Sequence, residues 1–171
     1  MMLFLLATLS APAQEYVLPQ NPNEKVQTPL GEVRAEVVMR FCRAERVYIA
    51  DITDVESYTA TYSGRIRVLS DVQLTILHPL KGQYPSPVYV EQIAGGRVGN
   101  TVMRSSHAAL SPTIGKRYVL SQQHITNPQT NSTFWHLTAS IELDATAQIP
   151  ADVATQFMQH VEQYCPAEQV Q

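Results

Sequence analysis

The spacing of apolar residues divides the chain into two helix-like ends and a strand-like middle. Toward the start, Val33, Val37 and Phe41 recur at four-residue spacing, which places them on one face of a helix. Thr28 and Pro29 precede them, and a hydroxyl N-cap followed by proline is a typical helix start. The pattern predicts a helix of about three to four turns that begins at Pro29.

A second apolar stripe lies near the end of the chain, where Val153, Phe157 and Val161 repeat the same spacing after Pro150. Cys42 and Cys165 stand at the C-terminal ends of the two stripes. If the two helices dock side by side, their thiols come close enough to be joined. We therefore expect a Cys42–Cys165 disulfide, and two separate buried thiols are the alternative.

Between the two stripes the apolar spacing changes to two residues, which is typical of β-strands. The longest alternating run extends from Ile66 to Ile76 and lapses at Ser70, which predicts a bend or bulge there. Gly95, Gly96 and Gly99 predict a loop, as a hairpin turn or barrel corner. Five strands are expected, at about residues 47–52, 66–76, 88–92, 117–124 and 134–143.

The first residues predict export. An apolar run over residues 2–7 leads to Ala11-Pro12-Ala13, a small-x-small pattern that suits signal peptidase cleavage before Gln14. The run is too short to cross a bilayer, and a buried N-terminal strand or helix is the alternative. The expected organisation is a signal peptide (1–13), a flexible leader (14–28), a single domain (29–165) and a tail (166–171). A periplasmic or secreted location would favour pairing of the cysteines.

Composition narrows the class of protein further. The chain has 171 residues, of which 44% are hydrophobic and 16% charged, as expected for one globular domain. Its net charge is −3 and it has no run of Lys and Arg, so nucleic acid is not an expected partner. Nothing after the first residues is long and apolar enough for a membrane span.

Several short motifs resemble small exported bacterial proteins of unassigned function. The run from Ala44 to Ile52 resembles their first strand, Leu80-Lys81-Gly82 their turn after a long second strand, and Ile114 to Leu120 their fourth strand. This group is similar in pattern to the netrin-like barrel of tissue inhibitors of metalloproteinases. The resemblance covers roughly residues 42–143. It implies a β-rich α+β fold, a five-stranded antiparallel OB-type barrel flanked by an N-terminal and a C-terminal helix.

The resemblance does not extend to the inhibitory mechanism of that family. The metalloproteinase inhibitors place the amino group of an N-terminal cysteine on the zinc of their target. Here the expected mature chain begins at Gln14, and the first cysteine is Cys42.

Two histidines are the candidates for a metal site. His124 and His136 flank a predicted turn at residues 127–132, and on a hairpin they could face each other. A zinc site needs three or four ligands, and no third ligand is marked by spacing. Ser105, Ser106 and His107 are adjacent in sequence, whereas a catalytic triad is assembled by the fold. We therefore expect no metal, cofactor or catalytic residue.

Other side chains are expected to have structural roles. Asp51, Asp54 and Glu56 predict a solvated acidic edge near the end of the first strand. Phe134 and Trp135 are neighbours on a strand, so one should pack in the core and the other should face outward as a possible binding anchor.

Two functional hypotheses follow. The first is a non-catalytic exported module whose barrel face or loops bind a protein or a glycan. The alternative is a metal-dependent or hydrolytic envelope enzyme that uses the histidines.

Overall fold

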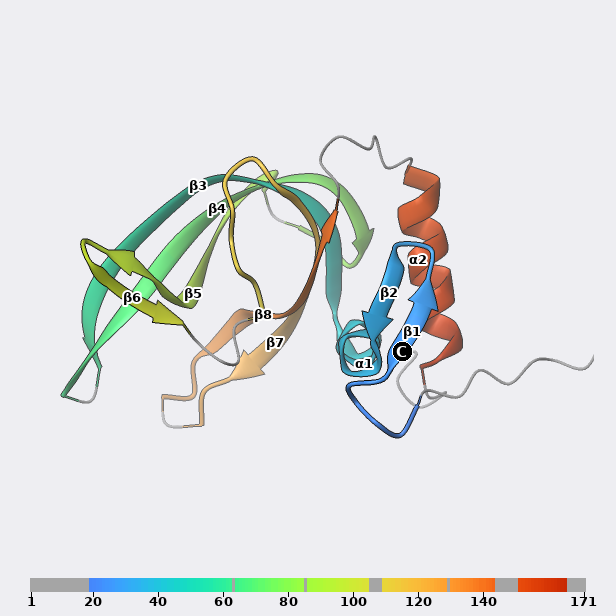
Figure 1. The fold of residues 1–171 in the computed structure, drawn as a ribbon, viewed down its shortest axis with the longest axis horizontal. Coiled ribbons are helices and arrows are strands. Elements are labelled where there is room, and N and C mark those ends of the chain that lie inside the picture. The colour runs from blue at the N-terminus through green and yellow to red at the C-terminus, as the bar shows by residue number, and fades with distance from the viewer. Residues whose placement is uncertain are drawn as a thin grey trace, which may run out of the picture.

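A six-stranded antiparallel sheet forms most of the structure, a computed structural model that describes residues 19–62, 64–84, 86–104, 109–128, 130–143 and 151–165. The strand order is β6-β5-β4-β3-β7-β8 (Figure 1). The strands are β3 (Arg46–Tyr62), β4 (Arg65–Lys81), β5 (Val88–Val98), β6 (Thr101–Arg104), β7 (Arg117–Thr126) and β8 (Thr133–Leu143). The expected signal peptide and tail lie outside the described residues.

The β-rich prediction is confirmed, and the strand count and closure differ from it. Each of the five predicted alternating runs lies within a strand, and β5 continues through Gly95 and Gly96 of the expected loop, whereas Gly99 lies in the turn that follows. The sixth strand, β6, was not predicted, because its four residues are all exposed and leave no alternation to detect. The hydrogen-bonded ladder is open, with β6 and β8 at its edges, in place of a closed five-stranded barrel.

The sheet bends at bulges in its two longest strands. Pairing between β3 and β4 shifts after Val47, after Ile49 and between Ile52 and Asp54. Ser70, where a bulge was expected, pairs regularly with Ser57. Because an extra residue on one strand bends it and increases its twist, these shifts curve the sheet strongly, as Figure 1 shows.

The predicted N-terminal helix is wrong in its first part. Strands β1 (Lys25–Thr28) and β2 (Gly31–Arg34) form a separate hairpin, and helix α1 (Ala35–Arg43) begins only after it. Thr28 Oγ1 donates a hydrogen bond to the Gly31 carbonyl and accepts one from the Leu30 amide, so the hydroxyl stabilises a turn. Gly31 has φ = 100°, which a helix excludes. Residues 25–28 of the expected leader are therefore in a strand.

Both helices cover one face of the sheet. Helix α2 (Ala151–Gln163) lies beside α1, and the rings of Phe41 and Phe157 meet edge to face at 5.2 Å. This side of the core also takes residues from β1, β2, β3, β7 and β8, including Val26, Val33, Val47, Val119 and Leu143. In the described part of the chain, neither helix is long and apolar enough to cross a membrane.

The other face of the curved sheet encloses a second core. It is built from residues of β3, β4, β7 and β8 and from Leu110 in the connection before β7. Its buried members are Tyr48, Ala50, Ile52, Val72, Leu74, Leu110, Tyr118, Leu120 and Leu137. The sheet thus separates a helix-covered core from an interior core.

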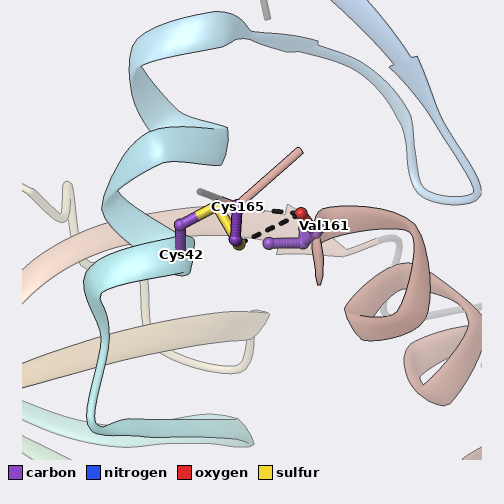
Figure 2. Close-up of a disulfide and its surroundings, with 3 residues drawn as sticks. All are labelled: Cys42, Val161 and Cys165. Atoms are coloured by element: carbon purple, nitrogen blue, oxygen red, sulfur yellow. Dashed lines mark hydrogen bonds between the residues drawn. A yellow bond between two sulfur atoms is a disulfide. The ribbon is translucent and has the colours of Figure 1, made fainter. Parts of the chain in front are cut away.

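The predicted disulfide is present between Cys42, near the end of α1, and Cys165, just after α2 (Figure 2). Their Cα atoms are 5.4 Å apart, which is an ordinary spacing for a disulfide. The Val161 carbonyl oxygen lies 3.2 Å from Sγ of Cys165 and 3.7 Å from Sγ of Cys42. The bond joins the two helices across the core that they cover.

Candidate functional site: a groove beside an arginine-rich end of the sheet

A groove of about 550 Å³ lies between the β5–β6 hairpin and the segment 110–113, and β3 and β4 form its floor. This volume is within the range of ligand-binding clefts. The lining combines apolar side chains with hydroxyl groups and two arginines. Its members include Val55, Ser57, Met103, Leu110, Arg97 and Arg104.

The glycines of β5 let the hairpin pass closely over the floor. Pairing of β5 with β4 ends at Ala94. Ser70 Oγ then donates a hydrogen bond to the Gly95 carbonyl at 2.7 Å, and the hydroxyls of Ser57 and Ser70 are hydrogen-bonded at 2.7 Å. A Cβ at Gly96 would collide with both serine side chains. The hydroxyls of Ser57 and Ser70 therefore approach β5 so closely that only glycine fits at position 96.

The register of the hairpin decides which side chains share a face. Arg97 pairs with Val102 and Gly95 pairs with Arg104, so Arg97, Val102 and Arg104 lie on one face. Met103 pairs with Gly96 and lies on the opposite face, the side on which the two floor serines approach. The two arginines thus share one face of the hairpin and Met103 lies on the other, and all three residues line the groove.

The end of the sheet that carries the groove is basic, although the protein as a whole is acidic. Residues 57–70 and 92–104 contain Arg65, Arg67, Arg97 and Arg104 and no Asp or Glu, whereas the net charge of the chain is −3. Figure 1 shows the β3–β4 and β5–β6 turns at the same end of the long axis, away from the helices. The ion pairs Lys25–Glu32, Arg34–Glu36, Lys116–Glu142 and Arg117–Asp51 lie outside these two segments.

A buried carboxylate lies deeper in the interior core. Glu91 of β5 is 3% exposed, and its Oε2 accepts a hydrogen bond from Gln122 Nε2 of β7 at 2.8 Å. Its Oε1 accepts one from the Leu137 amide of β8 at 3.2 Å. Burial raises the pKa of Glu91, although these hydrogen bonds act in the opposite direction. Since β4 and β3 separate β5 from β7 in the sheet, Glu91 bridges the two flanks of the curved sheet.

An aromatic cluster surrounds Arg46 near this carboxylate. The Arg46 guanidinium lies 3.5 Å from the centre of the Trp135 ring and 5.4 Å from that of Tyr84. Tyr84 meets Tyr48 edge to face at 4.8 Å. Burial raises the pKa of Tyr48, whose buried hydroxyl has no hydrogen-bond partner among the described residues. Phe134 is exposed, as one of the two neighbours was predicted to be, whereas Trp135 is half-buried in this cluster and belongs to neither core.

The two candidate metal ligands do not meet. His124 pairs with Trp135, and His136 pairs with Gln123. Because neighbouring residues on a strand face opposite sides, the two imidazoles lie on opposite faces of the sheet. Among the described residues, no group of three or more His, Cys, Asp or Glu side chains could hold a metal ion. Ser105, Ser106 and His107 lie outside the described residues.

The expected acidic edge is only partly solvated. Asp51 accepts two hydrogen bonds from Arg117, from Nε at 2.7 Å and from Nη2 at 3.0 Å. Asp54 accepts a hydrogen bond from the Val55 amide. Asp51 therefore links β3 to β7.

Sequence reasoning missed the residues of the groove and of the Glu91 cluster. The absence of acidic residues over 57–70 and 92–104 was the available signal for the groove. No such signal marked Glu91, which follows two valines in an ordinary strand. No protein-family model and no curated protein matches the chain.

Proposed function

We propose that this protein is a non-catalytic, exported binding module whose groove takes a protein or glycan ligand with anionic groups. The observation that carries the proposal is the pair of segments around the groove that hold four arginines and no carboxylate. Clefts lined by charge of one sign attract ligands of the opposite sign. The apolar and hydroxyl groups of the lining supply further contacts for the uncharged parts of such a ligand.

The proposal includes an OB- or netrin-type barrel in which the five strands other than β6 approach closure. OB-type barrels are partly open, and they bind ligands on a strand face and its adjoining loops. Glu91 supports this arrangement, since its carboxylate connects β5 to the amide of Leu137 in β8. The contact takes the place of a ladder between the two strands.

Export is proposed on two observations. The apolar run and small-x-small pattern at residues 2–13 suit a signal peptide. The disulfide between Cys42 and Cys165 favours an oxidising compartment, such as the periplasm or the exterior of the cell.

The alternative, a metal-dependent or hydrolytic enzyme that uses the histidines, gains no support from the described residues. His124 and His136 would have to approach a common atom, and they lie on opposite faces of the sheet.

Calorimetry with two anionic probes, a sulfated oligosaccharide and an oligoglutamate peptide, tests the proposal. At least one probe should bind at low salt, and its affinity should fall as salt rises, because exposed charges are screened. The Arg97→Gln/Arg104→Gln variant should bind roughly tenfold more weakly, which corresponds to about 1.4 kcal/mol.

The matched control is Arg34→Gln/Arg43→Gln, which removes the same charge beside α1, away from the groove. It should bind within about twofold of the wild type, because distant surface charges act weakly through solvent. Equal losses in the two double variants, or no binding of either probe, would refute the proposed site.

A further inference from the structure

The geometry points to one class of ligand for this site: we propose that an acidic, extended peptide segment adds as a new strand to the open edge of β6. The inference rests on the proposed function, because the same arginines are used. It adds a binding mode, backbone pairing, that a purely electrostatic site would not have.

The hairpin leaves pairing groups of β6 facing outward. A two-residue turn, Gly99 and Asn100, joins Val98 to Thr101, and Gly99 has the positive φ of 55° that such turns use. The residues that flank a two-residue turn exchange hydrogen bonds with each other, and the next pair does not. Val102 and Arg104 therefore direct their N–H and C=O groups away from β5.

No strand of the described chain takes up these groups. The sheet ends at β6, and all four of its residues are exposed. The edge is only four residues long, so backbone pairing alone would bind weakly. The groove lies directly beside it and is lined by Val102, Met103 and Arg104. An added strand would therefore gain side-chain contacts there as well.

Charge decides which occupant suits the edge. Arginines on an edge strand ordinarily discourage pairing with another strand. A second copy of this protein would place like charges together, since Arg97 and Arg104 share a face with Val102. A segment that alternates acidic and apolar residues would set its carboxylates against the arginines. The arginines therefore favour pairing of the β6 edge with an acidic segment and disfavour its pairing with a basic one.

The site also distinguishes a peptide from an anionic glycan. A glycan would use the arginines and the hydroxyls of the groove but would leave the Val102 and Arg104 amides exposed to solvent. A paired peptide would protect both amides, because each would donate to a carbonyl of the added strand. Amide hydrogen exchange at these two positions therefore separates the two classes of ligand.

A synthetic nonapeptide of alternating Glu and Val is the probe, and the same peptide with Lys in place of Glu is its control. The Glu peptide should bind in a fluorescence anisotropy titration, and the Lys peptide should not. Exchange of the Val102 and Arg104 amides, followed by NMR, should slow at least fivefold in the complex. The Met103 amide, which faces β5, should change little.

Two variants of one position isolate the backbone contribution. Val102→Pro removes an outward N–H without removing a bond to β5, and proline is tolerated at such edge positions. It should weaken the Glu peptide at least tenfold, whereas Val102→Thr, which keeps the N–H, should remain within threefold. If Val102→Pro unfolds the hairpin, amide exchange of Val102 and Arg104 in the wild-type complex provides the second test, because absence of protection there overturns strand addition.

The outcomes separate this inference from the proposed function. Strand addition is overturned if the Glu peptide binds Val102→Pro as tightly as the wild type and does not protect the amides. If that binding is still lost when the arginines are replaced, the groove remains a site for anionic ligands. Binding of the sulfated oligosaccharide alone also overturns strand addition and leaves the groove as such a site. A dimer that sedimentation detects and that Val102→Pro dissociates would assign the edge to a second copy. Failure of every anionic probe refutes both proposals.

Discussion

Glu91 and the two valines before it show how cross-strand register overrides hydrophobicity at single residues. Val88 and Val90 face outward and are 44% and 56% exposed, while Glu91 faces the interior. The pairs Glu91–Val72 and Tyr89–Leu74 set this orientation, because Val72 and Leu74 belong to the interior core. Strand β5 was predictable from its β-branched residues. Hydrophobicity, however, indicates that the face with Val88 and Val90 points inward, and in the structure the opposite face does.

The buried carboxylate makes stability depend on pH in a definite direction. The pKa of folded Glu91 lies above its ordinary value, so the folded state holds the proton more tightly than the unfolded state. Its favourable contribution is complete below the unfolded pKa of about 4.3 and is lost as pH rises through the folded pKa. As the pH rises from 4 to 7, the wild type should therefore lose unfolding free energy relative to Glu91→Gln.

Urea unfolding of the two proteins across this range measures the difference, and groups common to both cancel. A difference that stays constant with pH, or that moves in favour of the wild type, would contradict the assignment of a raised pKa to Glu91.

At the scale of elements, the hairpins explain which parts of the fold were predictable. Strands β3, β4, β7 and β8 were predictable from their alternating runs, because each has an apolar face against a core. The helix expected to begin at Pro29 begins only at Ala35, since Val33 faces the core from a strand as well as it would from a helix. A hairpin turn was one expectation for the glycine-containing segment at residues 95–99, but strand β6 was missed because its exposed residues leave no periodic signal.

Gly96 is the residue on which the groove depends most directly. Its φ of 138° and its contact with Ser57 and Ser70 exclude a side chain. Gly96→Ala should displace the hairpin, lower stability by more than the cost of a positive φ alone, about 1–2 kcal/mol, and weaken binding of the anionic probes.

Gly115→Ala is the matched control. Gly115 has φ = 81° and open space around its Cα, so it should show only the backbone cost. Thermal unfolding and probe titration of both variants provide the comparison, and equal destabilisation of the two would show that the serine contacts do not constrain Gly96.

At the scale of the whole molecule, the disulfide holds the helix-covered core together. The cysteines were predictable as a pair because both ended apolar stripes, and the contact between Phe41 and Phe157 shows that the stripes meet. The curvature of the open sheet was not predictable, because it depends on bulges in β3 and β4 and on a buried Glu91 contact between distant strands.

Removing the disulfide should destabilise the protein strongly. The bond spans 123 residues, and closing a loop of this size corresponds to roughly 4–5 kcal/mol in the chain-entropy description. Cys42→Ala/Cys165→Ala should lower the free energy of unfolding by up to this amount. Denaturant unfolding measures the loss, and reductant should destabilise the wild type similarly while leaving the variant unaffected. A wild type insensitive to reductant would contradict a bond that stabilises the fold.

The position of the bond also determines how the molecule would respond to mechanical force. All six strands of the main sheet lie between residues 42 and 165, inside the covalent loop. Tension applied to the segments outside the loop would pass between Cys42 and Cys165 through the sulfur atoms and would not stretch the sheet. Reduction would release about 400 Å of extendable chain, at roughly 3.3–3.6 Å per residue, and would transmit the load to the strands between the two cysteines.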